Sequence, residues 1–318
     1  MTLHPTLKEI ITVTKAANNP PLSRVPLAEI RKGPMKIRPL AGEPKPLAKV
    51  MNHIIHHEEG NLLVRLYYPK ENTLLPVLLY FHPGGFVKGD IDAHDPTCRA
   101  LADASGCLIA SMNYPLSPEN PFPKALNAAK AVLHWISSHP KEISSDGRIA
   151  IGGEDAGGNL AAVLTQEVRD EPHPDISFQV LIYPQTDLTC SSLSHLEYGS
   201  GYLLEKESIE WYRKQYLDSD HDLTDPRISP LYFPDFSSLP PALILTAEYD
   251  PMRDEGESYA QKLKEKGVPV KLKRYKGMVH GFFQMAGLLD DARLAIQEVG
   301  ETLKAHFKLE YTDHVSKF

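Results

Sequence analysis

From residue 50 onward, apolar runs of strand length alternate with longer segments in which apolar residues recur at helical spacing. The run at 77–82 is nearly continuous, which is typical of a strand buried on both faces of a parallel sheet. Further strands are predicted at 107–112, 148–152, 178–183, 242–246 and 270–275. Helices are predicted at 96–105, 124–139, 157–169, 256–266 and 290–307. This alternation predicts an α/β fold, with a mostly parallel central sheet flanked by helices.

The first fifty residues follow a different pattern. Residues 3–17 carry apolar side chains at helical spacing, and Pro20 ends that helix because proline cannot continue it. A second short helix is predicted at 25–32, after which the four prolines spaced from Pro34 to Pro46 predict an extended, irregular stretch. We therefore expect a helical cap with an extended segment at 1–48, and the main domain at 49–318.

Two further segments depart from the strand–helix alternation. Strands predicted at 50–57 and 62–68 flank the turn-forming residues 58–61, which indicates a hairpin. The segment 189–241 lies between two sheet strands and is rich in charged and aromatic side chains, among them Tyr202 and Tyr212. An insertion at this place, at about 189–225, is expected to lie over the strand ends as a lid that shapes a substrate pocket.

Composition narrows the classes of function. The 318 residues carry 41 acidic and 34 basic side chains, a net charge of −7, which argues against a nucleic-acid partner. No apolar run approaches the ~18–20 residues of a membrane span, and the amino terminus lacks the pattern of a signal peptide, so a cytoplasmic protein without stable membrane insertion is expected. The three cysteines are expected to be reduced. Three histidines between 53 and 57 are interpreted as a polar strand end, and no metal site is expected.

The first segment with candidate chemistry is Gly153-Glu154-Asp155-Ala156-Gly157, between a predicted strand and a predicted helix. A nucleophile elbow forms at such a junction, and its glycines permit the cramped turn because a Cβ there would collide with neighbouring elements. The central side chain, that of Asp155, is then directed out above the sheet. Backbone N–H groups and the helix dipole favour negative charge at that point.

A glycine turn directly follows the strand at 77–82. Gly84 and Gly85 can point their backbone N–H groups at a negatively charged oxygen, whereas Pro83 has no N–H. Together with Ala156 from the elbow, they form a predicted oxyanion hole. Taken alone, this stretch would be interpreted as a simple turn.

Two more candidates follow later strands of the predicted sheet. Asp250 comes after the strand at 242–246, and His280 comes after the strand at 270–275. Elbow, acid and histidine thus occur in the order expected of α/β-hydrolases. Because each element follows a strand, a catalytic role for His280 is favoured over a structural one. We therefore predict Asp155, Asp250 and His280 as the catalytic residues.

With these motifs in place, the chain resembles the hormone-sensitive-lipase family of α/β-hydrolases over nearly its whole length after residue 50. Beyond the elbow, the resemblance is carried by Ser117-Pro118-Glu119-Asn120-Pro121-Phe122-Pro123, Asp225-Pro226-Arg227-Ile228-Ser229-Pro230 and Gly267-Val268-Pro269-Val270. The resemblance implies hydrolysis of carboxylic esters, usually small acyl esters, without a cofactor. It also implies an ester or similar apolar small molecule as the partner, and a homodimer through the sheet edge.

The resemblance assigns roles to the candidate residues, with one departure. It implies oxyanion donors at Gly84, Gly85 and Ala156, and an orienting acid and base at Asp250 and His280. The family normally has serine where this chain has Asp155. Aspartate has no proton for a base to remove, and its carboxylate reaches about one bond further than a serine oxygen, into the oxyanion hole.

Two consequences of Asp155 follow from simple electrostatics. The N–H groups of the oxyanion hole are predicted to bind the Asp155 carboxylate directly. His280, held between Asp155 and Asp250, is predicted to be protonated and therefore unable to act as a base. Attack on an ester would also give an anhydride, a poor intermediate. Serine-type activity is therefore predicted to be impaired.

Three hypotheses remain open at this point. In the first, Asp155 attacks saturated carbon, as in dehalogenases and epoxide hydrolases, with Tyr202 or Tyr212 as a lid donor. Two points count against it: packing roles are favoured for these tyrosines, and no tryptophan adjoins the nucleophile to bind a halide. Alternatively, the pocket binds a small molecule without turnover, as the family's plant hormone receptor does. In the third hypothesis Asp155, natural or engineered, replaces serine in an otherwise normal esterase.

Overall fold

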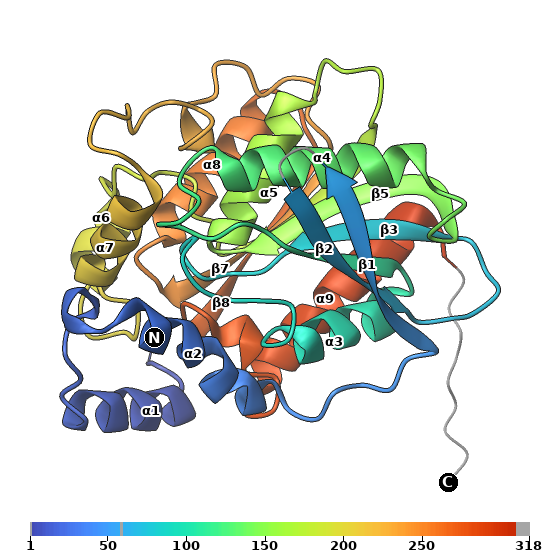
Figure 1. Ribbon diagram of the computed structural model, residues 1–318. Coiled ribbons are helices and arrows are strands. Elements are labelled where there is room, and N and C mark those ends of the chain that lie inside the picture. Colours follow the sequence, from blue (N-terminus) through green and yellow to red (C-terminus); the bar gives the residue numbers. More distant parts are fainter. Residues whose placement is uncertain (1, 58–59, 310–318) are drawn as a thin grey trace, which may run out of the picture.

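The computed structural model describes residues 2–57 and 60–309, and at its centre lies an eight-stranded sheet (Figure 1). The strand order is β1-β2-β4-β3-β5-β6-β7-β8. Strand β2 pairs antiparallel with β1 and β4, and the remaining neighbours are parallel. The strands are β1 (Lys49–His57), β2 (Gly60–Tyr68), β3 (Leu75–Phe81), β4 (Leu108–Asn113), β5 (Ser145–Glu154), β6 (Ile176–Ile182), β7 (Ala242–Tyr249) and β8 (Val270–Val279). The predicted α/β fold with a mostly parallel sheet is confirmed.

Strand β3, between β4 and β5, illustrates why continuous apolar runs form the sheet. All of its residues are buried, so both faces of the strand need apolar side chains. Val77 and Leu79 contribute to one apolar core, whereas Leu78 and Tyr80 contribute to the other. This alternation follows from the two-residue period of a strand.

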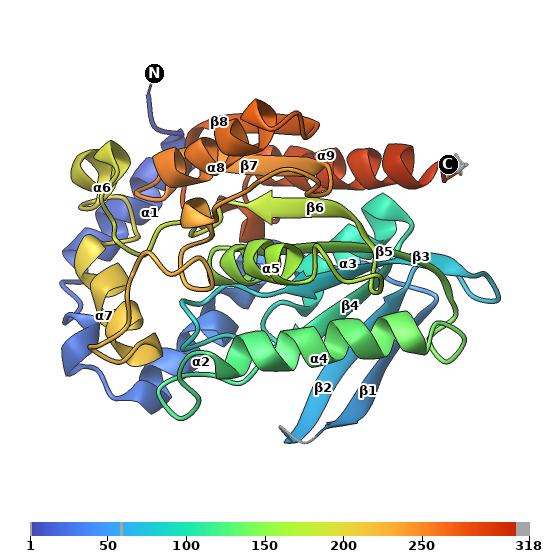
Figure 2. The same ribbon diagram turned by 90° about the horizontal axis from the view of Figure 1, so that it is seen from above.

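Helices cover both faces of the sheet (Figure 1 and Figure 2). On one face lie α4 (Lys124–Ser138), α5 (Ala156–Glu167) and α8 (Arg253–Glu265). On the other lie α3 (Asp95–Ser105) and α9 (Asp290–Phe307). The two apolar cores fill the space between these helix layers and the sheet.

The remaining helices gather at the end of the molecule where the parallel strands finish (Figure 2). Two come from the N-terminal segment and two from the insertion between β6 and β7: α1 (Pro5–Ala16), α2 (Leu27–Ile37), α6 (Leu193–Tyr198) and α7 (Lys206–Tyr216). Short 3-10 turns occur at Leu22–Arg24, Arg38–Ala41, Pro230–Tyr232 and Phe282–Gln284. Ligand sites of open α/β sheets form outside the carboxyl ends of the strands, so these helices are placed to cover such a site.

Some boundaries differ from those predicted. Helix α2 runs through Pro34 to Ile37, so the prediction of extended chain from Pro34 onward is wrong there. Pro34 is buried, and we attribute the continued helix to its packing, which offsets a penalty of about 3 kcal/mol for proline inside a helix. Pairing of His57 with Gly60 confirms the predicted hairpin, whereas positions 58 and 59 of its turn lie outside the described residues. Within the described ranges, no helix is both long and apolar enough to cross a membrane.

Candidate active site

Asp155 lies at the junction of β5 and α5, where the elbow motif predicts a sharp turn. Its φ of +54° and ψ of −119° are rarely adopted by L-amino acids. A Cβ on Gly153 would lie 2.4 Å from the Gly157 carbonyl, and a Cβ on Gly157 would lie 2.2 Å from the Phe81 carbonyl oxygen. Glycine is therefore required on both sides of the turn. The strained residue is held by a hydrogen bond from its N–H to the Ile182 carbonyl oxygen at 3.1 Å.

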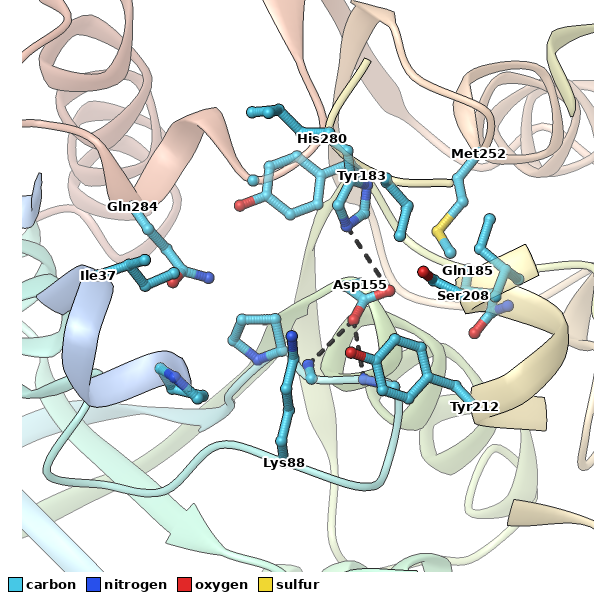
Figure 3. A pocket seen from close by; sticks show the side chains of 18 of the residues that line it. Ile37, Lys88, Asp155, Tyr183, Gln185, Ser208, Tyr212, Met252, His280 and Gln284 are labelled. Carbon is cyan, nitrogen blue, oxygen red and sulfur yellow. Dashed lines mark hydrogen bonds and ion pairs between the residues drawn. The ribbon is translucent and has the colours of Figure 1, made fainter. Parts of the chain in front are cut away.

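The loop after β3 holds the Asp155 carboxylate (Figure 3). Asp155 Oδ2 accepts hydrogen bonds from the N–H groups of Gly84 and Gly85, at 3.0 and 3.1 Å, which confirms the predicted contact. Both glycines have positive φ, +137° and +60°, and this backbone geometry aims their N–H groups at one point. Within the described part of the chain, Ala156 N–H forms no hydrogen bond with Asp155, so its donor role stays a prediction.

Asp250 and His280 follow β7 and β8, and the structure brings both beside Asp155. Asp250 Oδ2 lies 2.9 Å from His280 Nδ1, and His280 Nε2 lies 3.7 Å from Asp155 Oδ1. Asp250 is completely buried, and its other oxygen accepts a hydrogen bond from Met252 N–H at 2.8 Å. The Asp250 carboxylate is therefore held in one position, and its hydrogen bond with His280 orients the imidazole toward Asp155.

The surroundings of His280 raise its pKa, which favours the charged imidazole at neutral pH. Burial lowers the pKa of the imidazole, but the carboxylates of Asp250, Asp155 and Glu154 outweigh burial and raise the pKa to about 9. A protonated imidazole has two N–H donors and no acceptor. The raised pKa agrees with the predicted protonation of His280; that the residue cannot act as a base stays a prediction.

Glu154 anchors the site from the interior of the molecule. It is completely buried and accepts hydrogen bonds from the hydroxyl groups of Tyr80 and Tyr183 and from Gln284 Nε2, the last at 3.0 Å. Burial raises the pKa of the Glu154 carboxyl group, although these three donors act in the opposite direction. The Tyr183 ring also lies 4.7 Å from the His280 ring between centroids, so the network supports the histidine.

A cavity of about 420 Å³ is bounded by Asp155, His280 and the loop after β3 (Figure 3). Much of its apolar lining comes from the N-terminal segment and from the insertion between β6 and β7, with Ile10, Leu22, Pro34, Ile37, Leu40, Leu204 and Ile209 among the residues involved. An apolar cavity of this size with a few convergent polar groups suits a small organic ligand.

Two polar side chains of the cavity lie close to Gly84 and Gly85 in the loop after β3. Tyr212, from α7, lies against Gly85, since a Cβ on that glycine would be 2.6 Å from Tyr212 Cγ. Lys88 Nζ lies 5.4 Å from the centre of the Tyr212 ring, and both side chains line the cavity. Tyr202, by contrast, stacks on Tyr249 at 5.3 Å and is not a lining residue, which confirms the packing role favoured for it.

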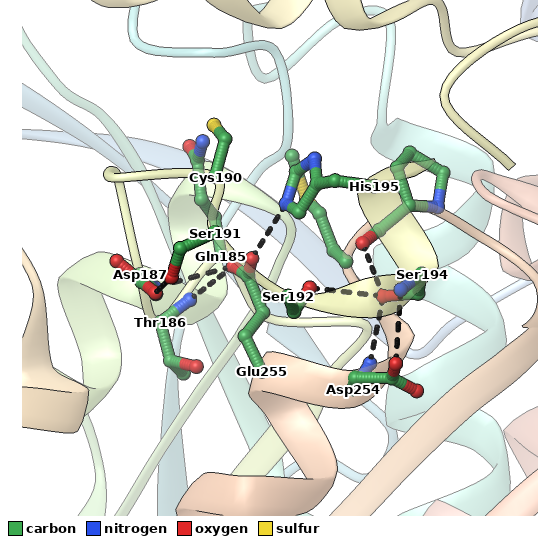
Figure 4. A network of polar contacts seen from close by, with 12 residues as sticks. Gln185, Thr186, Asp187, Cys190, Ser191, Ser192, Ser194, His195, Asp254 and Glu255 are labelled. Atoms are coloured by element: carbon green, nitrogen blue, oxygen red, sulfur yellow. Dashed lines mark hydrogen bonds and ion pairs between the residues drawn. The ribbon is translucent and has the colours of Figure 1, made fainter. Parts of the chain in front are cut away.

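A buried polar network joins α6, in the insertion between β6 and β7, to α8 (Figure 4). His195 Nε2 on α6 lies 2.8 Å from Glu255 Oε2 on α8, and their side chains are 0% and 1% exposed. Glu255 Oε1 accepts hydrogen bonds from the N–H groups of Thr186 and Asp187, at 2.8 and 3.2 Å. Burial raises the pKa of Glu255 to about 7, against the opposing effect of His195. This pair fixes α6 relative to α8.

The structure thus brings together all the residues predicted for the site and adds others that were missed. The position of Lys88 in the glycine turn, four residues after Gly84, could have indicated that it lies beside the site. Glu154 was signalled by its place at the end of a buried strand. The cap residues of the cavity and the His195–Glu255 pair had no signal, because they meet only in the folded chain. Across residues 2–57 and 60–309, no group of His, Cys, Asp and Glu side chains is arranged to hold a metal ion.

The fold and this geometry define an α/β-hydrolase. A family model described as alpha/beta hydrolase fold matches residues 78–284. The chain belongs to the α/β-hydrolase family, in its hormone-sensitive-lipase branch.

Relatives in sequence and in structure support the assignment to the α/β-hydrolases. The chain is 40% identical over 254 residues to Carboxylic ester hydrolase LipN of Mycobacterium tuberculosis, which covers 78% of this chain and 68% of that protein. It is 33% identical over 310 residues to Arylesterase of Saccharolobus solfataricus, which covers 97% of this chain and 100% of that protein. A serine-to-alanine mutant of LAE6, an α/β-hydrolase from the metagenome of Lake Arreo, superposes with a TM-score of 0.93 at 38% identity, over 96% of this chain and 99% of that one. By homology the chain therefore groups with the carboxylesterases of this branch.

Proposed function

We propose that this member of the carboxylesterase branch is blocked in serine-type turnover by Asp155 and that its cavity, as the chain stands, binds small esters without hydrolysing them at esterase rates. The cap at 1–48 and the lid at about 189–225 shape the ligand site. No cofactor takes part in this scheme.

Each neighbour of Asp155 keeps the role it would have in a working esterase. The N–H groups of Gly84, Gly85 and Ala156 would stabilise the oxyanion of a tetrahedral intermediate. His280 would take the proton of a serine at position 155, with Asp250 holding the imidazole in the required orientation. Only the nucleophile is changed.

The observation that carries the proposal is the position of Asp155 Oδ2, 3.0 and 3.1 Å from the N–H groups of Gly84 and Gly85. A substrate carbonyl oxygen would need those same donors during acyl transfer. The carboxylate therefore competes with the substrate for the hole, and its charge keeps His280 protonated. Both effects disappear when the carboxylate is removed.

The test compares hydrolysis of a short-chain nitrophenyl ester by the native chain, by Asp155→Ser and by Asp155→Ala. We expect Asp155→Ser to exceed the native chain by roughly 10³-fold or more in kcat/KM, because it regains a nucleophile in an assembled site. Asp155→Ala is the matched control, since it empties the oxyanion hole and adds no nucleophile, and it should stay inactive.

Two results would overturn the proposal. The first is an inactive Asp155→Ser variant whose melting temperature equals that of the native chain, because the remainder of the site would then not be that of an esterase. The second is a native chain that hydrolyses the ester as fast as Asp155→Ser, because Asp155 would then not block turnover.

A further inference from the structure

We propose that Asp155 is itself a nucleophile toward epoxides: it opens the ring to form an ester with the substrate, and water hydrolyses this ester to a diol. This reaction differs from serine-type ester hydrolysis. It requires the aspartate side chain at position 155, so it does not depend on the outcome of the Asp155→Ser experiment.

The two oxygens of Asp155 have different surroundings. Oδ2 is held by the N–H groups of Gly84 and Gly85, whereas Oδ1 forms no hydrogen bond with any described residue and lies 3.7 Å from His280 Nε2. Asp155 also lines the cavity, so Oδ1 is the oxygen available to a ligand. Attack by a carboxylate on strained saturated carbon gives an ester, which is a stable intermediate. The hydrogen bonds to Oδ2 that hinder attack on an ester thus orient Oδ1 for attack on saturated carbon.

The side chain placed to protonate the opening oxygen is Tyr212 (Figure 3). Its ring lies against Gly85, one of the two residues that hold Asp155, and its side chain lines the cavity. Lys88 extends from the same loop, with Cγ 3.2 Å from the place of a Cβ on Gly84 and Nζ 5.4 Å from the Tyr212 ring centre.

The identity of the leaving group follows from these donors. Neither Trp135 nor Trp211 lines the cavity, so no indole N–H is placed to solvate a halide. A phenol hydroxyl and a nearby ammonium group instead suit an oxygen that becomes an alkoxide. The substrate class is therefore a small epoxide with an apolar substituent, because most of the cavity lining is apolar.

The first half-reaction forms one bond and breaks one. Asp155 Oδ1 bonds to an epoxide carbon, the ring C–O bond breaks, and the freed oxygen takes the Tyr212 proton. Asp155 is then an uncharged ester, so one of the carboxylates that raise the pKa of His280 is lost. His280 releases its proton, which restores the hydroxyl group of Tyr212 directly or through solvent.

In the second half-reaction, neutral His280 takes a proton from water while the hydroxide adds to Cγ of Asp155. The oxyanion that forms on Oδ2 lies against the N–H groups of Gly84 and Gly85, at the distances already present. The bond from Cγ to Oδ1 then breaks, Oδ1 leaves as part of the diol, and it takes the remaining water proton from the carboxylic acid that Oδ2 and the water oxygen form. Asp155 is again a carboxylate, His280 is again protonated, and the net reaction is epoxide plus water to diol.

The test uses styrene oxide with the full-length chain and follows intact mass and diol formation. His280→Gln should accumulate one adduct per chain on the peptide that contains Asp155, since the ester forms but is not hydrolysed. Asp155→Asn should form no adduct. In water enriched in oxygen-18, a single turnover of the native chain should place the label in Asp155 and not in the diol.

A matched pair of tyrosine variants tests the proton donor. Tyr212→Phe should slow adduct formation about 10-fold or more, whereas Tyr202→Phe, which alters a tyrosine outside the cavity, should leave the rate unchanged. No adduct on a His280→Gln variant that melts like the native chain would overturn the inference. Labelled diol in the first turnover would do so as well, because water would then attack the epoxide directly.

Discussion

At the scale of single residues, the carboxylate at position 155 sets both the occupant of the oxyanion hole and the charge of His280. The aspartate side chain has one carbonyl group and one negative charge that serine lacks. Because the hydrogen bonds at 3.0 and 3.1 Å go to Oδ2, removal of this oxygen frees the N–H groups of Gly84 and Gly85. Removal of the charge also frees the histidine for proton transfer.

The pKa of His280 should therefore depend on Asp155. In Asp155→Asn one of the carboxylates that outweigh burial is gone, so the pKa should fall from about 9 toward the ordinary value of about 6.5. NMR titration of the imidazole would measure this shift. Asp170→Asn, which removes a carboxylate exposed on the surface, is the control and should leave the His280 pKa unchanged. Equal values in the native chain and Asp155→Asn would contradict the account.

The raised pKa also predicts how stability changes with pH. The folded-state pKa of about 9 lies above an unfolded value of about 6.5, so folding strengthens proton binding to His280. The resulting stabilisation is complete below about pH 6.5 and is lost as pH rises through 9. Between pH 7 and 9.5, the free energy of unfolding should fall more in the native chain than in His280→Gln. Urea denaturation at several pH values measures this difference, and parallel curves would contradict it.

At the scale of elements, the elbow between β5 and α5 depends on close contact with β3. A Cβ on Gly157 would meet the Phe81 carbonyl oxygen at 2.2 Å. Gly157→Ala should therefore cost about 3 kcal/mol of unfolding free energy or more. Gly33→Ala is the control in helix α2, where a Cβ meets nothing within 4 Å, and it should change stability by less than about 1 kcal/mol. Equal effects of the two substitutions on chemical denaturation would refute this role for the elbow.

The attachment of α6 should depend on the buried pair between His195 and Glu255. His195→Ala removes one partner and leaves a buried carboxylate, which should cost about 3 kcal/mol. Glu255→Gln keeps an acceptor for the N–H groups of Thr186 and Asp187 and leaves no charge, so about 1 kcal/mol is expected. Thermal or urea denaturation ranks the two variants. A larger loss in Glu255→Gln would show that the contact between His195 and Glu255 does not attach α6 to α8.

Elements with a strong periodic pattern could be predicted from the sequence, and those set by tertiary packing could not. Helix α9 (Asp290–Phe307) has the predicted bounds, because its apolar stripe is regular over the whole segment. Helix α2 continues past Pro34, against the local preference of proline. Strand β8 extends to Val279 instead of ending at 275, because its last residues pair with β7 as far as Tyr249. Pairing of this kind is a long-range contact that no local pattern reports.

At the scale of the whole molecule, the site exists only where four separate parts of the chain meet. The elbow, the oxyanion loop, Asp250 and His280 each follow a strand of one parallel sheet, which is why their meeting place could be predicted. Much of the cavity wall comes from the N-terminal segment and from the insertion between β6 and β7, and those side chains could not be assigned from the sequence. A homodimer through the sheet edge stays a prediction of the family resemblance.

The central claim is that an assembled esterase site surrounds a single altered nucleophile. A nitrophenyl phosphonate ester tests this most directly, because it reacts with a nucleophile that is activated by a histidine and faces an oxyanion hole. Intact-mass analysis should find one phosphonyl group per chain on Asp155→Ser, at position 155, and none on the native chain or on Asp155→Ala. An unlabelled Asp155→Ser variant that folds like the native chain, or a label at any other residue, would contradict the claim.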